Sequence, residues 1–517
     1  MFNCWPMPYP PDPMHPLAQL DHKYLWHPFT QMRDWLKQEP ILITQGKGPW
    51  LKDVHGKKYL DANSSIWVNL HGHSHPKINA AIRRQLKKIA HSSALGFANE
   101  PASLLAEKLV KLAQVGGKMG NSGSRGKPPR FPALTKNPQL AKVFFSDNGS
   151  TAMEAALKIT YQFAVRTGLS KSPKFLSLDG AYHGDTVGAV SLGHVDLFHK
   201  AYHGLLFSSD KVMAPYCYRC PFNRAKPERE DARKYRQCRW ECVGKVEQAF
   251  ARQKKTGNPY AGFIFEPLMQ GAAGMIPQPS GWLRQVADIA RGNGALLIAD
   301  EVMTGFGRTG VTCHITDETE VQVIEKADQV RLFATARVGV VPDVLCVAKG
   351  LTGGYVPMAA TLTTDKIFSA FLGRYDEFKT FFHGHSFTGN QIGAAAAIAS
   401  LDILASKPSI QARIRLQKAF QKSLRSLWQY SQVGDIRQVG LVMGIELVKD
   451  WRTREPFPLS AQVGFRICDA MARRGVLTRP VGSVIVFIPP YCTTPAQAAK
   501  TVDALGDSIR EIFGRKR

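Results

Sequence analysis

The chain has 517 residues, 44% of them hydrophobic, and it carries a formal net charge of +26. A chain of this length can bury a large core, and it contains no apolar run of the roughly 20 residues that a membrane-spanning helix requires, so we expect no membrane partner. The basic residues are spread thinly, and their densest stretches do not interleave aromatic side chains as a nucleic-acid stacking platform would. We therefore expect no nucleic-acid partner, and the sequence leaves the reason for the strong basic charge open.

The first residues of the chain are rich in proline and methionine and lack the basic start and apolar block of a secretory signal. We expect residues 1–21 to form a disordered leader. The chain has nine cysteines, an odd number, and in a long chain without an export signal these are expected to be reduced. Together these features predict a cytoplasmic protein.

Short apolar segments alternate with amphipathic stretches through the middle of the chain. Strands that alternate with helices predict an α/β fold, in which a mostly parallel sheet is wound with helices on both faces. We expect this large domain to span residues 81–405. Residues 22–80 are expected to join a smaller α+β domain, which residues 406–517 complete.

Two stretches of the large domain have the composition or position of loop inserts. Residues 116–139 are rich in glycine, proline and basic residues and have little to bury, which is typical of a mobile loop. Residues 314–339 interrupt the path between Gly310 and Pro342. The role of both inserts is left open.

The segment SDNGSTAMEAALK places small and hydroxyl residues at the start of a strong helical pattern. Backbone N–H groups and the dipole at a helix N-terminus bind phosphate, and Gly149 and Ser150 would allow the close approach. An ordinary helix cap explains the same residues. The segment DGAYHGDT follows, and its Tyr182 and His183 could offer an aromatic face to a flat ring.

A separate pattern of cysteines lies further along the chain. Cys217 and Cys220 form C-x-x-C, and Cys238 and Cys242 form C-x-x-x-C after a gap of seventeen residues, which is near the spacing of a four-thiolate zinc site. A zinc-bearing module that binds nucleic acid or protein is therefore the alternative from another functional class. Reduced loop cysteines explain the same pattern, and we predict no metal site.

Two segments carry the chemistry more directly. In PDVLCVAKGLTGGYVPMA, Lys349 stands between an apolar strand and a glycine-rich turn, where an ammonium is costly unless it is paired. A desolvated lysine becomes a nucleophile toward carbonyls, although a salt-bridged lysine would explain the position as well. In LLIADEVMTGFGRTG, Asp300 could supply the carboxylate that a pyridoxal cofactor needs at its ring nitrogen.

Six motifs in order resemble the subgroup III aminotransferases, the ornithine and GABA aminotransferase class. They are SDNGSTA, AYHGDT, IFEP, LLIADEVMTGFGRTG, VLCVAKGLTGGYVPMA and HGHSFTGN. The resemblance covers most of residues 25–500 and implies a fold type I homodimer with pyridoxal 5'-phosphate as cofactor. It implies that Lys349 bonds the cofactor, that Asp300 pairs with the ring nitrogen, that Gly149 and Ser150 hold the phosphate, and that Tyr182 stacks near the ring.

The segment HGHSFTGN departs mildly from that class, because Ser386 stands where the class usually has threonine. The resemblance implies that this hydroxyl reaches the phosphate of the neighbouring subunit's cofactor. His385 is placed with the cofactor and Gly384 with the substrate on the same resemblance.

Finer motifs resemble the 7,8-diaminononanoate synthases of biotin biosynthesis, which aminate 8-amino-7-oxononanoate. These are LWHPFTQM, SSIWVNLHGHSHP, IAHSSALGFAN, APYCYRCPF and LTRPVGSVIVFIPPY. The resemblance implies that Arg479 pairs with the substrate carboxylate, a task that suits a guanidinium. It also places Phe29, Ile66, Trp67 and Tyr182 with the substrate.

The amino donor is left open between S-adenosylmethionine and lysine. Members of this group that use S-adenosylmethionine often have tyrosine at the position of Phe29 and tryptophan at that of Ile66, while a branch with the pattern seen here includes enzymes that use lysine. Within enzymes, the alternative is another class III ω-aminotransferase that acts on GABA, ornithine or a similar amine.

Overall fold

The computed structural model describes residues 14–114, 139–310 and 331–514. Residues 1–13 of the expected leader and residues 116–138 and 314–330 of the expected inserts lie outside these ranges. Among the described residues, no helix is both long enough and apolar enough to cross a bilayer.

The ranges predicted for the leader (residues 1–21) and for the second insert (residues 314–339) each include residues that the structure places in regular elements. Helix α1 (Pro16–Tyr24) begins inside the leader, with His15 as its N-cap and a proline in its first turn, which is where proline suits a helix. In the second insert, Leu332 and Phe333 are buried in the main core and helix α12 (Ala334–Arg337) follows them. These last residues of the insert are therefore part of the packed large domain.

A seven-stranded sheet forms the centre of the large domain, in the order β4-β12-β11-β10-β7-β5-β6. All neighbouring pairs are parallel except those made by β12, which runs antiparallel to both β11 and β4. The strands are β4 (Leu140–Ser146), β5 (Lys174–Leu178), β6 (Asp210–Val212), β7 (Tyr260–Phe265), β10 (Leu296–Asp300), β11 (Val344–Val347) and β12 (Ala359–Thr364).

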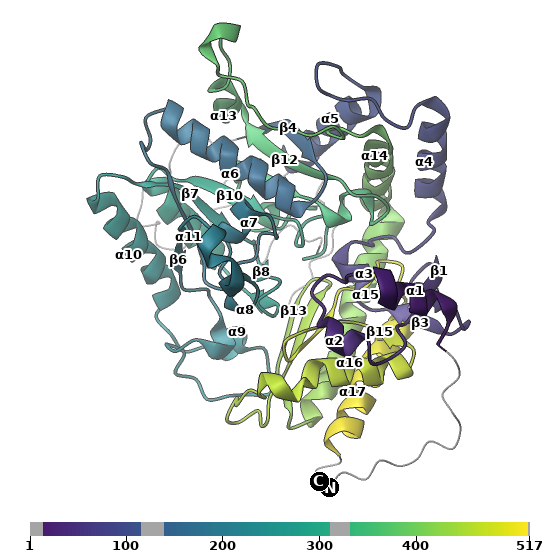
Figure 1. Cartoon of the computed structure of the whole chain (residues 1–517). Helices are drawn as coiled ribbons and strands as arrows, with labels where there is room; N and C mark the ends of the chain where they lie inside the picture. The colour runs from purple at the N-terminus through teal and green to yellow at the C-terminus, as the bar shows by residue number, and fades with distance from the viewer. Residues whose placement is uncertain (1–13, 115–138, 311–330, 515–517) are drawn as a thin grey trace.

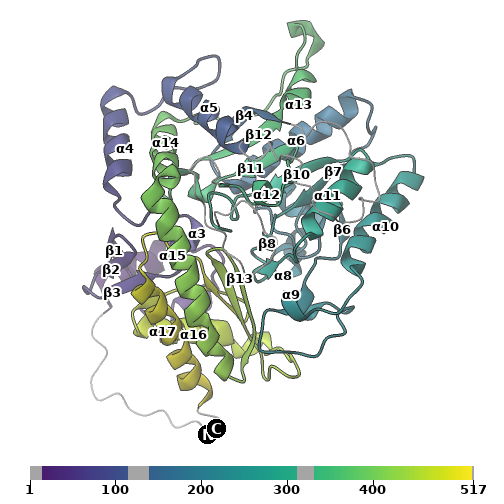
Figure 2. The ribbon, with the colours of Figure 1, turned by 180° about the vertical axis from the view of Figure 1, so that it is seen from behind.

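Helices cover both faces of this sheet, as Figures 1 and 2 show from opposite sides. Along β10, Leu296 and Ile298 pack in one core with α6, while Leu297 and Ala299 pack in another with α10 and α11. The expected α/β fold with helices on both faces is therefore confirmed. The helices of this part are α4 (Pro76–Lys88), α5 (Glu100–Gln114), α6 (Gly149–Arg166), α7 (Val187–Ser191), α8 (Asp196–His199), α9 (Ala232–Tyr235), α10 (Glu241–Lys255), α11 (Trp282–Gly292), α13 (Asp365–Ser369) and α14 (Gln391–Ala405).

The two ends of the chain meet in the smaller domain. Strand β3 pairs in parallel with β15, so that Leu60 and Asp61 lie opposite Val476 and Leu477. One sheet has the order β1-β2-β3-β15 and the other β13-β14-β17-β16, and a two-stranded sheet joins β8 to β9. The strands are β1 (Ile43–Lys47), β2 (Trp50–Asp53), β3 (Lys58–Asp61), β8 (Met269–Gln270), β9 (Ile276–Pro277), β13 (Val433–Val439), β14 (Val442–Leu447), β15 (Val476–Leu477), β16 (Pro480–Val481) and β17 (Val484–Phe487).

Long helices cover the second of these sheets, and α15 runs across it in Figure 2. The expected boundary at residue 405 falls where α14 ends and α15 begins. The boundaries at residues 80 and 405 stay predictions. The helices of this part are α2 (Met32–Trp35), α3 (Ser64–Trp67), α15 (Lys407–Leu424), α16 (Val463–Arg473) and α17 (Pro495–Phe513).

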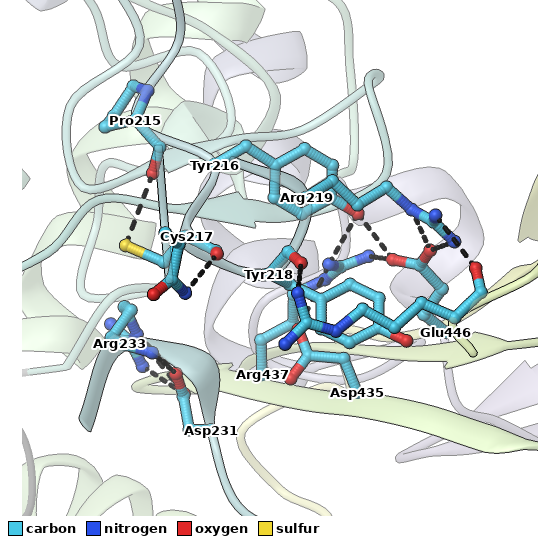
Figure 3. Close-up of polar contacts among 12 residues, drawn as sticks. Pro215, Tyr216, Cys217, Tyr218, Arg219, Asp231, Arg233, Asp435, Arg437 and Glu446 are labelled. Carbon is cyan, nitrogen blue, oxygen red and sulfur yellow. Dashed lines mark hydrogen bonds and ion pairs between the residues drawn. The ribbon is translucent and has the colours of Figure 1, made fainter. Parts of the chain in front are cut away.

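A buried ionic cluster ties residues 214–240 of the large domain to strands β13 and β14 (Figure 3). Arg437 is fully buried, and its guanidinium donates to Glu446 at 2.6 Å and to Asp435 at 3.2 Å. Arg219 and the hydroxyl of Tyr216 also donate to Glu446. Because a buried charge is tolerated only when it is paired, this cluster fixes how the segment lies on the small domain.

Candidate active site

Lys349 lies just after strand β11, in the short 3-10 helix η4 (Lys349–Thr352). Its φ of 44° is in the left-handed region, which non-glycine residues avoid unless the surrounding structure holds them there. Gly354, with φ of 85°, follows closely, and a Cβ at this position would lie 2.8 Å from the backbone of Asn69. Glycine is therefore required at this turn, because the backbone at Gly354 lies in contact with the backbone at Asn69 and leaves no room for a side chain.

The amine of Lys349 is half-buried against an aromatic ring. Its Nζ lies 4.5 Å from the centre of the Trp67 ring. Desolvation lowers the pKa of Lys349 to about 8, against the opposing effects of the carboxylates of Asp300 and Glu266. About one tenth of this amine is therefore neutral at pH 7, far more than for an ordinary lysine, and the neutral form is the one that attacks a carbonyl.

Asp300 ends strand β10, which lies beside β11 in the sheet, so its carboxylate and Lys349 meet at the same edge. The carboxylate is buried, and its Oδ2 lies 2.8 Å from Nδ1 of His183 while its Oδ1 accepts from the N–H of Val302 at 3.0 Å. The ring of His183, suggested as part of an aromatic face, is the hydrogen-bond partner of Asp300, and its role as an aromatic face stays a prediction. Each carboxylate oxygen keeps a lone pair for a further partner.

Glu266 is a buried carboxyl that the sequence analysis did not assign. It follows strand β7, accepts from the N–H of Tyr182 at 3.3 Å and from that of Gly271 at 2.8 Å, and burial raises its pKa to about 7. The hydroxyl of Tyr182 donates to Asp185 at 2.7 Å. The only signal in the sequence was a charged residue directly after a fully buried strand in IFEP.

Arg308 is a second residue that the sequence analysis missed. It is fully buried, and it donates to the carbonyl oxygens of Trp67, Asn69 and Pro489 at 3.4, 3.1 and 2.7 Å. Desolvation lowers the pKa of this guanidinium. An arginine inside the glycine-rich GFGRTG was the available signal, and its role is to hold the segment that carries Trp67.

The start of α6 faces the same edge of the sheet. Asn148 caps the helix through the N–H of Thr151, so the ordinary capping role is present, and the N–H groups of Gly149 and Ser150 are those left for an anion. A Cβ at Gly149 would lie 2.7 Å from Val302, and one at Gly184 would overlap the Ser150 side chain. The glycines therefore let the helix start lie against the residues that follow Asp300.

Four of the six residues assigned to the substrate come from the two ends of the chain. Ile66 (49% exposed) and Trp67 lie on one tight turn, and Arg479 donates through Nη2 to the carbonyl oxygen of Phe29 (56% exposed) at 2.9 Å. The ring of Phe198 lies edge-on between those of Phe29, at 5.3 Å, and Tyr182, at 6.2 Å. The structure thus connects Arg479 and Phe29 to Tyr182 through an aromatic residue that the sequence analysis did not select.

The segment HGHSFTGN lies near the start of α6. Nδ1 of His385 is 3.4 Å from Asp147, which precedes the N-cap residue of α6. Ser386 is exposed, and its carbonyl oxygen accepts from His91 at 2.7 Å. Gly384 is exposed as well. Among the described residues of this segment, His385 is the one that a polar contact joins to the start of α6 within the same chain.

The cysteines of the alternative zinc module line one small pocket together with Pro215, Trp240 and Pro279. Among the described residues, however, no three side chains of the metal-binding types are grouped so that they could hold an ion. The zinc-bearing alternative gains no support from this arrangement.

Comparison with known proteins places the chain in a family. The family described as "Aminotransferase class-III" matches residues 32–327 and 330–509. A relative from Geobacter sulfurreducens, named adenosylmethionine-8-amino-7-oxononanoate aminotransferase, is 41% identical over 96% of this chain and 98% of its own length.

Solved structures agree with this assignment. The aminotransferase of the same name from Methanocaldococcus jannaschii is 37% identical, covers 96% of this chain and 98% of its own, and has a TM-score of 0.79. An amine transaminase from an uncultivated Pseudomonas species, solved in its PLP-bound form, is 30% identical with a TM-score of 0.79 and covers 94% of this chain and 98% of its own.

The residues at the sheet edge fit a pyridoxal cofactor. Lys349 offers an amine of lowered pKa, Asp300 a carboxylate with free lone pairs, and α6 an N-terminus with two N–H groups. Nε2 of His183 is buried and has no partner among the described residues, which leaves one polar atom of the site for a bound group. The chain belongs to the class III aminotransferases, the pyridoxal 5'-phosphate-dependent transaminases of this fold.

Proposed function

We propose that this enzyme aminates 8-amino-7-oxononanoate to 7,8-diaminononanoate, a step of biotin biosynthesis. The observation that carries the proposal is the near full-length identity of 41% to the Geobacter sulfurreducens aminotransferase that bears this substrate in its name. We further propose that the enzyme works in the cytoplasm and as a homodimer.

The cofactor, when bound, supplies the electron sink that makes the proton beside the transferred nitrogen acidic. Lys349 would hold it covalently, Asp300 would keep its ring nitrogen protonated, and Gly149 and Ser150 would receive its phosphate. With the cofactor bound, the amine of Lys349, once displaced by the donor amine, would act as the base that removes the proton from the donor's α-carbon and as the acid that returns one. A pKa of about 8 suits that exchange, because the amine can both accept and release a proton near neutral pH.

Arg479 supports a substrate with a terminal carboxylate. A guanidinium pairs with a carboxylate in a two-pronged geometry, and Arg479 uses only Nη2 in its bond to the Phe29 carbonyl oxygen. The rings of Phe29, Phe198 and Tyr182 would line the path from this arginine toward Lys349. Such a path suits an acid with a long apolar chain between its carboxylate and its reacting carbonyl.

The proposed dimer rests on an exposed apolar surface around Ser386. Four large apolar side chains in two segments are between 57% and 85% exposed: Leu95, Phe97, Phe382 and Phe387. His91, which precedes Leu95 and Phe97 in the sequence, is hydrogen-bonded to the carbonyl oxygen of Ser386. Large exposed apolar side chains mark protein interaction surfaces where they lie together. In the dimer, the Ser386 hydroxyl would reach the phosphate of the partner subunit's cofactor.

A half-reaction identifies the donor. The holoenzyme is mixed separately with S-adenosylmethionine and with lysine, and absorbance reports which one converts the cofactor to its aminated form. We favour S-adenosylmethionine, the donor in the names of the relatives. Conversion by lysine alone would reverse that choice without touching the keto-acid assignment.

The keto-acid substrate is tested by adding 8-amino-7-oxononanoate to the aminated enzyme and detecting 7,8-diaminononanoate. We expect Arg479→Lys to raise the KM for this acid by about tenfold or more, because a lysine cannot reproduce the two-pronged contact. Arg474→Lys, a change at an arginine bonded to Glu511, is the matched control and should leave KM unchanged. No product with either donor would instead favour an amine transaminase such as the Pseudomonas relative.

A further inference from the structure

The turn that carries Ile66 and Trp67 is strained. Ser64, Ser65, Ile66 and Trp67 have φ of 48°, 47°, 65° and 70°, four successive non-glycine residues in the left-handed region. Each such residue costs about 1–2 kcal/mol, and a run of them is held only when surrounding groups determine the backbone. The strain lies beside Lys349, because the Trp67 ring is 4.5 Å from its Nζ.

One buried carboxylate holds this turn. Asp61 ends strand β3 and is 2% exposed. Its Oδ1 accepts from the N–H groups of Asn63 at 3.2 Å and Ser65 at 3.0 Å, and its Oδ2 accepts from the Ser65 hydroxyl at 3.0 Å. These bonds fix the backbone at the entry to the left-handed run.

Asp61 is itself held in place by the fold. Nε2 of His73 lies 3.0 Å from Oδ2 of Asp61. Asn69 lies 2.9 Å from the other ring nitrogen of His73 and can donate to it, which leaves the His73 proton on Nε2, facing Asp61. The N–H of Asp61 donates to Pro49 at 2.8 Å. A rigid strand end and a histidine therefore fix the carboxylate before it fixes the turn.

The exit of the turn is held from the other side. The indole N–H of Trp67 donates to Asn63 at 2.8 Å, and the buried Arg308 donates to the Trp67 carbonyl oxygen at 3.4 Å. Asn63 is one of the two residues whose N–H groups bond Asp61. The carboxylate and the tryptophan ring are thus joined through a single residue.

We propose that Asp61 is a positioning residue of the aminotransferase, which acts by holding the strained turn so that the Trp67 ring lies against the amine of Lys349. The proposal concerns the common transaminase chemistry and does not depend on the identity of the keto acid or the donor. Asp61 touches no substrate in this assignment, and its influence passes through Trp67.

The chain offers a closely matched control. Asp53, at the end of the neighbouring strand β2, is also buried and accepts from N–H groups two and four residues ahead, those of His55 at 3.0 Å and Lys57 at 2.9 Å, and from the Tyr59 hydroxyl at 2.8 Å. Its turn carries no residue of the site. Asp61→Asn and Asp53→Asn therefore remove the same charge from closely similar sets of bonds, which differ in the contact that Asp61 makes with His73.

The test compares the two variants in the holoenzyme and the apoenzyme. We expect Asp61→Asn to lower kcat/KM by about 100-fold, the effect of a reacting group displaced by about 1 Å. We also expect it to change the pH midpoint at which the apoenzyme takes up pyridoxal phosphate. That midpoint should move in the same direction as in Trp67→Leu. Asp53→Asn should lower the melting temperature comparably and leave the midpoint unchanged. Ser65→Ala, which removes one bond, should give a smaller change of the same kind.

A double-mutant cycle decides whether Asp61 acts through Trp67. In the presence of Trp67→Leu, the change Asp61→Asn should cost little further kcat/KM, because coupled residues are not additive. Additive losses, or an unchanged uptake midpoint in both Asp61→Asn and Ser65→Ala, would overturn the proposal and leave Asp61 with a structural role only.

Discussion

The Nζ of Lys349 lies 4.5 Å from the centre of the Trp67 ring. Trp67 lies on the left-handed turn of the N-terminal segment, far from Lys349 in the sequence. An aromatic face attracts an ammonium, while desolvation disfavours it and lowers the pKa of Lys349 to about 8. The carboxylates of Asp300 and Glu266 act against desolvation, and together these effects set how much neutral amine is present at a given pH.

Removal of the Lys349 amine should abolish both the reaction and the link to the cofactor. We expect Lys349→Ala to show no turnover and no absorbance of the lysine-bound cofactor. The check is an absorbance spectrum of the purified variant after addition of pyridoxal phosphate, together with the half-reaction. A variant that kept both signals would show that another residue bonds the cofactor.

The lowered pKa of Lys349 predicts the pH dependence of cofactor uptake by the apoenzyme. Only the neutral amine reacts, so the uptake rate should rise with pH and level off above about 8, rather than continue toward the ordinary lysine value of 10.5. Trp67→Leu keeps an apolar side chain but removes the ring that stabilises the ammonium, so the midpoint should move to lower pH. Stopped-flow absorbance across pH 6–10 measures both, and Trp50→Leu, at a ring that lies against Lys500, is the control.

The carboxylate of Asp300 should matter for chemistry more than for folding. Asp300→Asn keeps the size and the bond to Val302 but loses the charge, and we expect kcat to fall by roughly 10²–10⁴-fold, the range for loss of a proton-transfer partner. The cofactor should still be bound through Lys349. Absorbance and half-reaction rates test this, and a variant with unchanged kcat would exclude Asp300 as the partner of the ring nitrogen.

The glycine that starts α6 should tolerate no Cβ. Because a Cβ at Gly149 would lie 2.7 Å from Val302, Gly149→Ala should push the helix start away and weaken pyridoxal phosphate binding by about tenfold or more. Gly292, in helix α11, has open space around its Cβ position, so Gly292→Ala should change stability by less than about 1 kcal/mol and leave cofactor affinity intact. Equilibrium titration with the cofactor compares the two.

Loss of one partner in the buried ionic cluster should destabilise the protein strongly. Arg437→Met leaves Glu446 and Asp435 buried beside an apolar side chain, which should cost about 3–5 kcal/mol. Arg452→Met breaks an exposed pair with Asp450 and should cost less than about 1 kcal/mol. Urea unfolding of both variants gives the difference, and equal midpoints would mean that the cluster contributes little.

Much of the fold could be predicted from local patterns in the sequence. The apolar run of β10 and the helical pattern of α6 each depend on neighbouring residues, so alternating strands and helices were visible without the structure. The predicted range of the second insert, residues 314–339, includes Leu332 and Phe333 because these two residues form no regular pattern of their own. They are buried only because the main core receives them.

The site divides in the same way. Lys349, Asp300 and Gly149 each stand next to a local signal, a buried strand or a helix start, which made them candidates, and the resemblance of the surrounding motifs supplied the role expected of each. Glu266, Arg308 and Asp61 act through bonds to backbone groups that are distant in sequence or that lie on a strained turn, and no local pattern marks such a partner.

The sequence by itself determined which elements form and pointed to the amine of Lys349, the carboxylate of Asp300 and the start of α6 as candidate site groups, because short-range periodicity and motifs depend only on neighbouring residues. Only the tertiary structure decided what surrounds the amine. The Trp67 ring, the buried Glu266 and the left-handed turn held by Asp61 reach Lys349 through the packing of distant segments, and the pKa of the lysine depends on that packing.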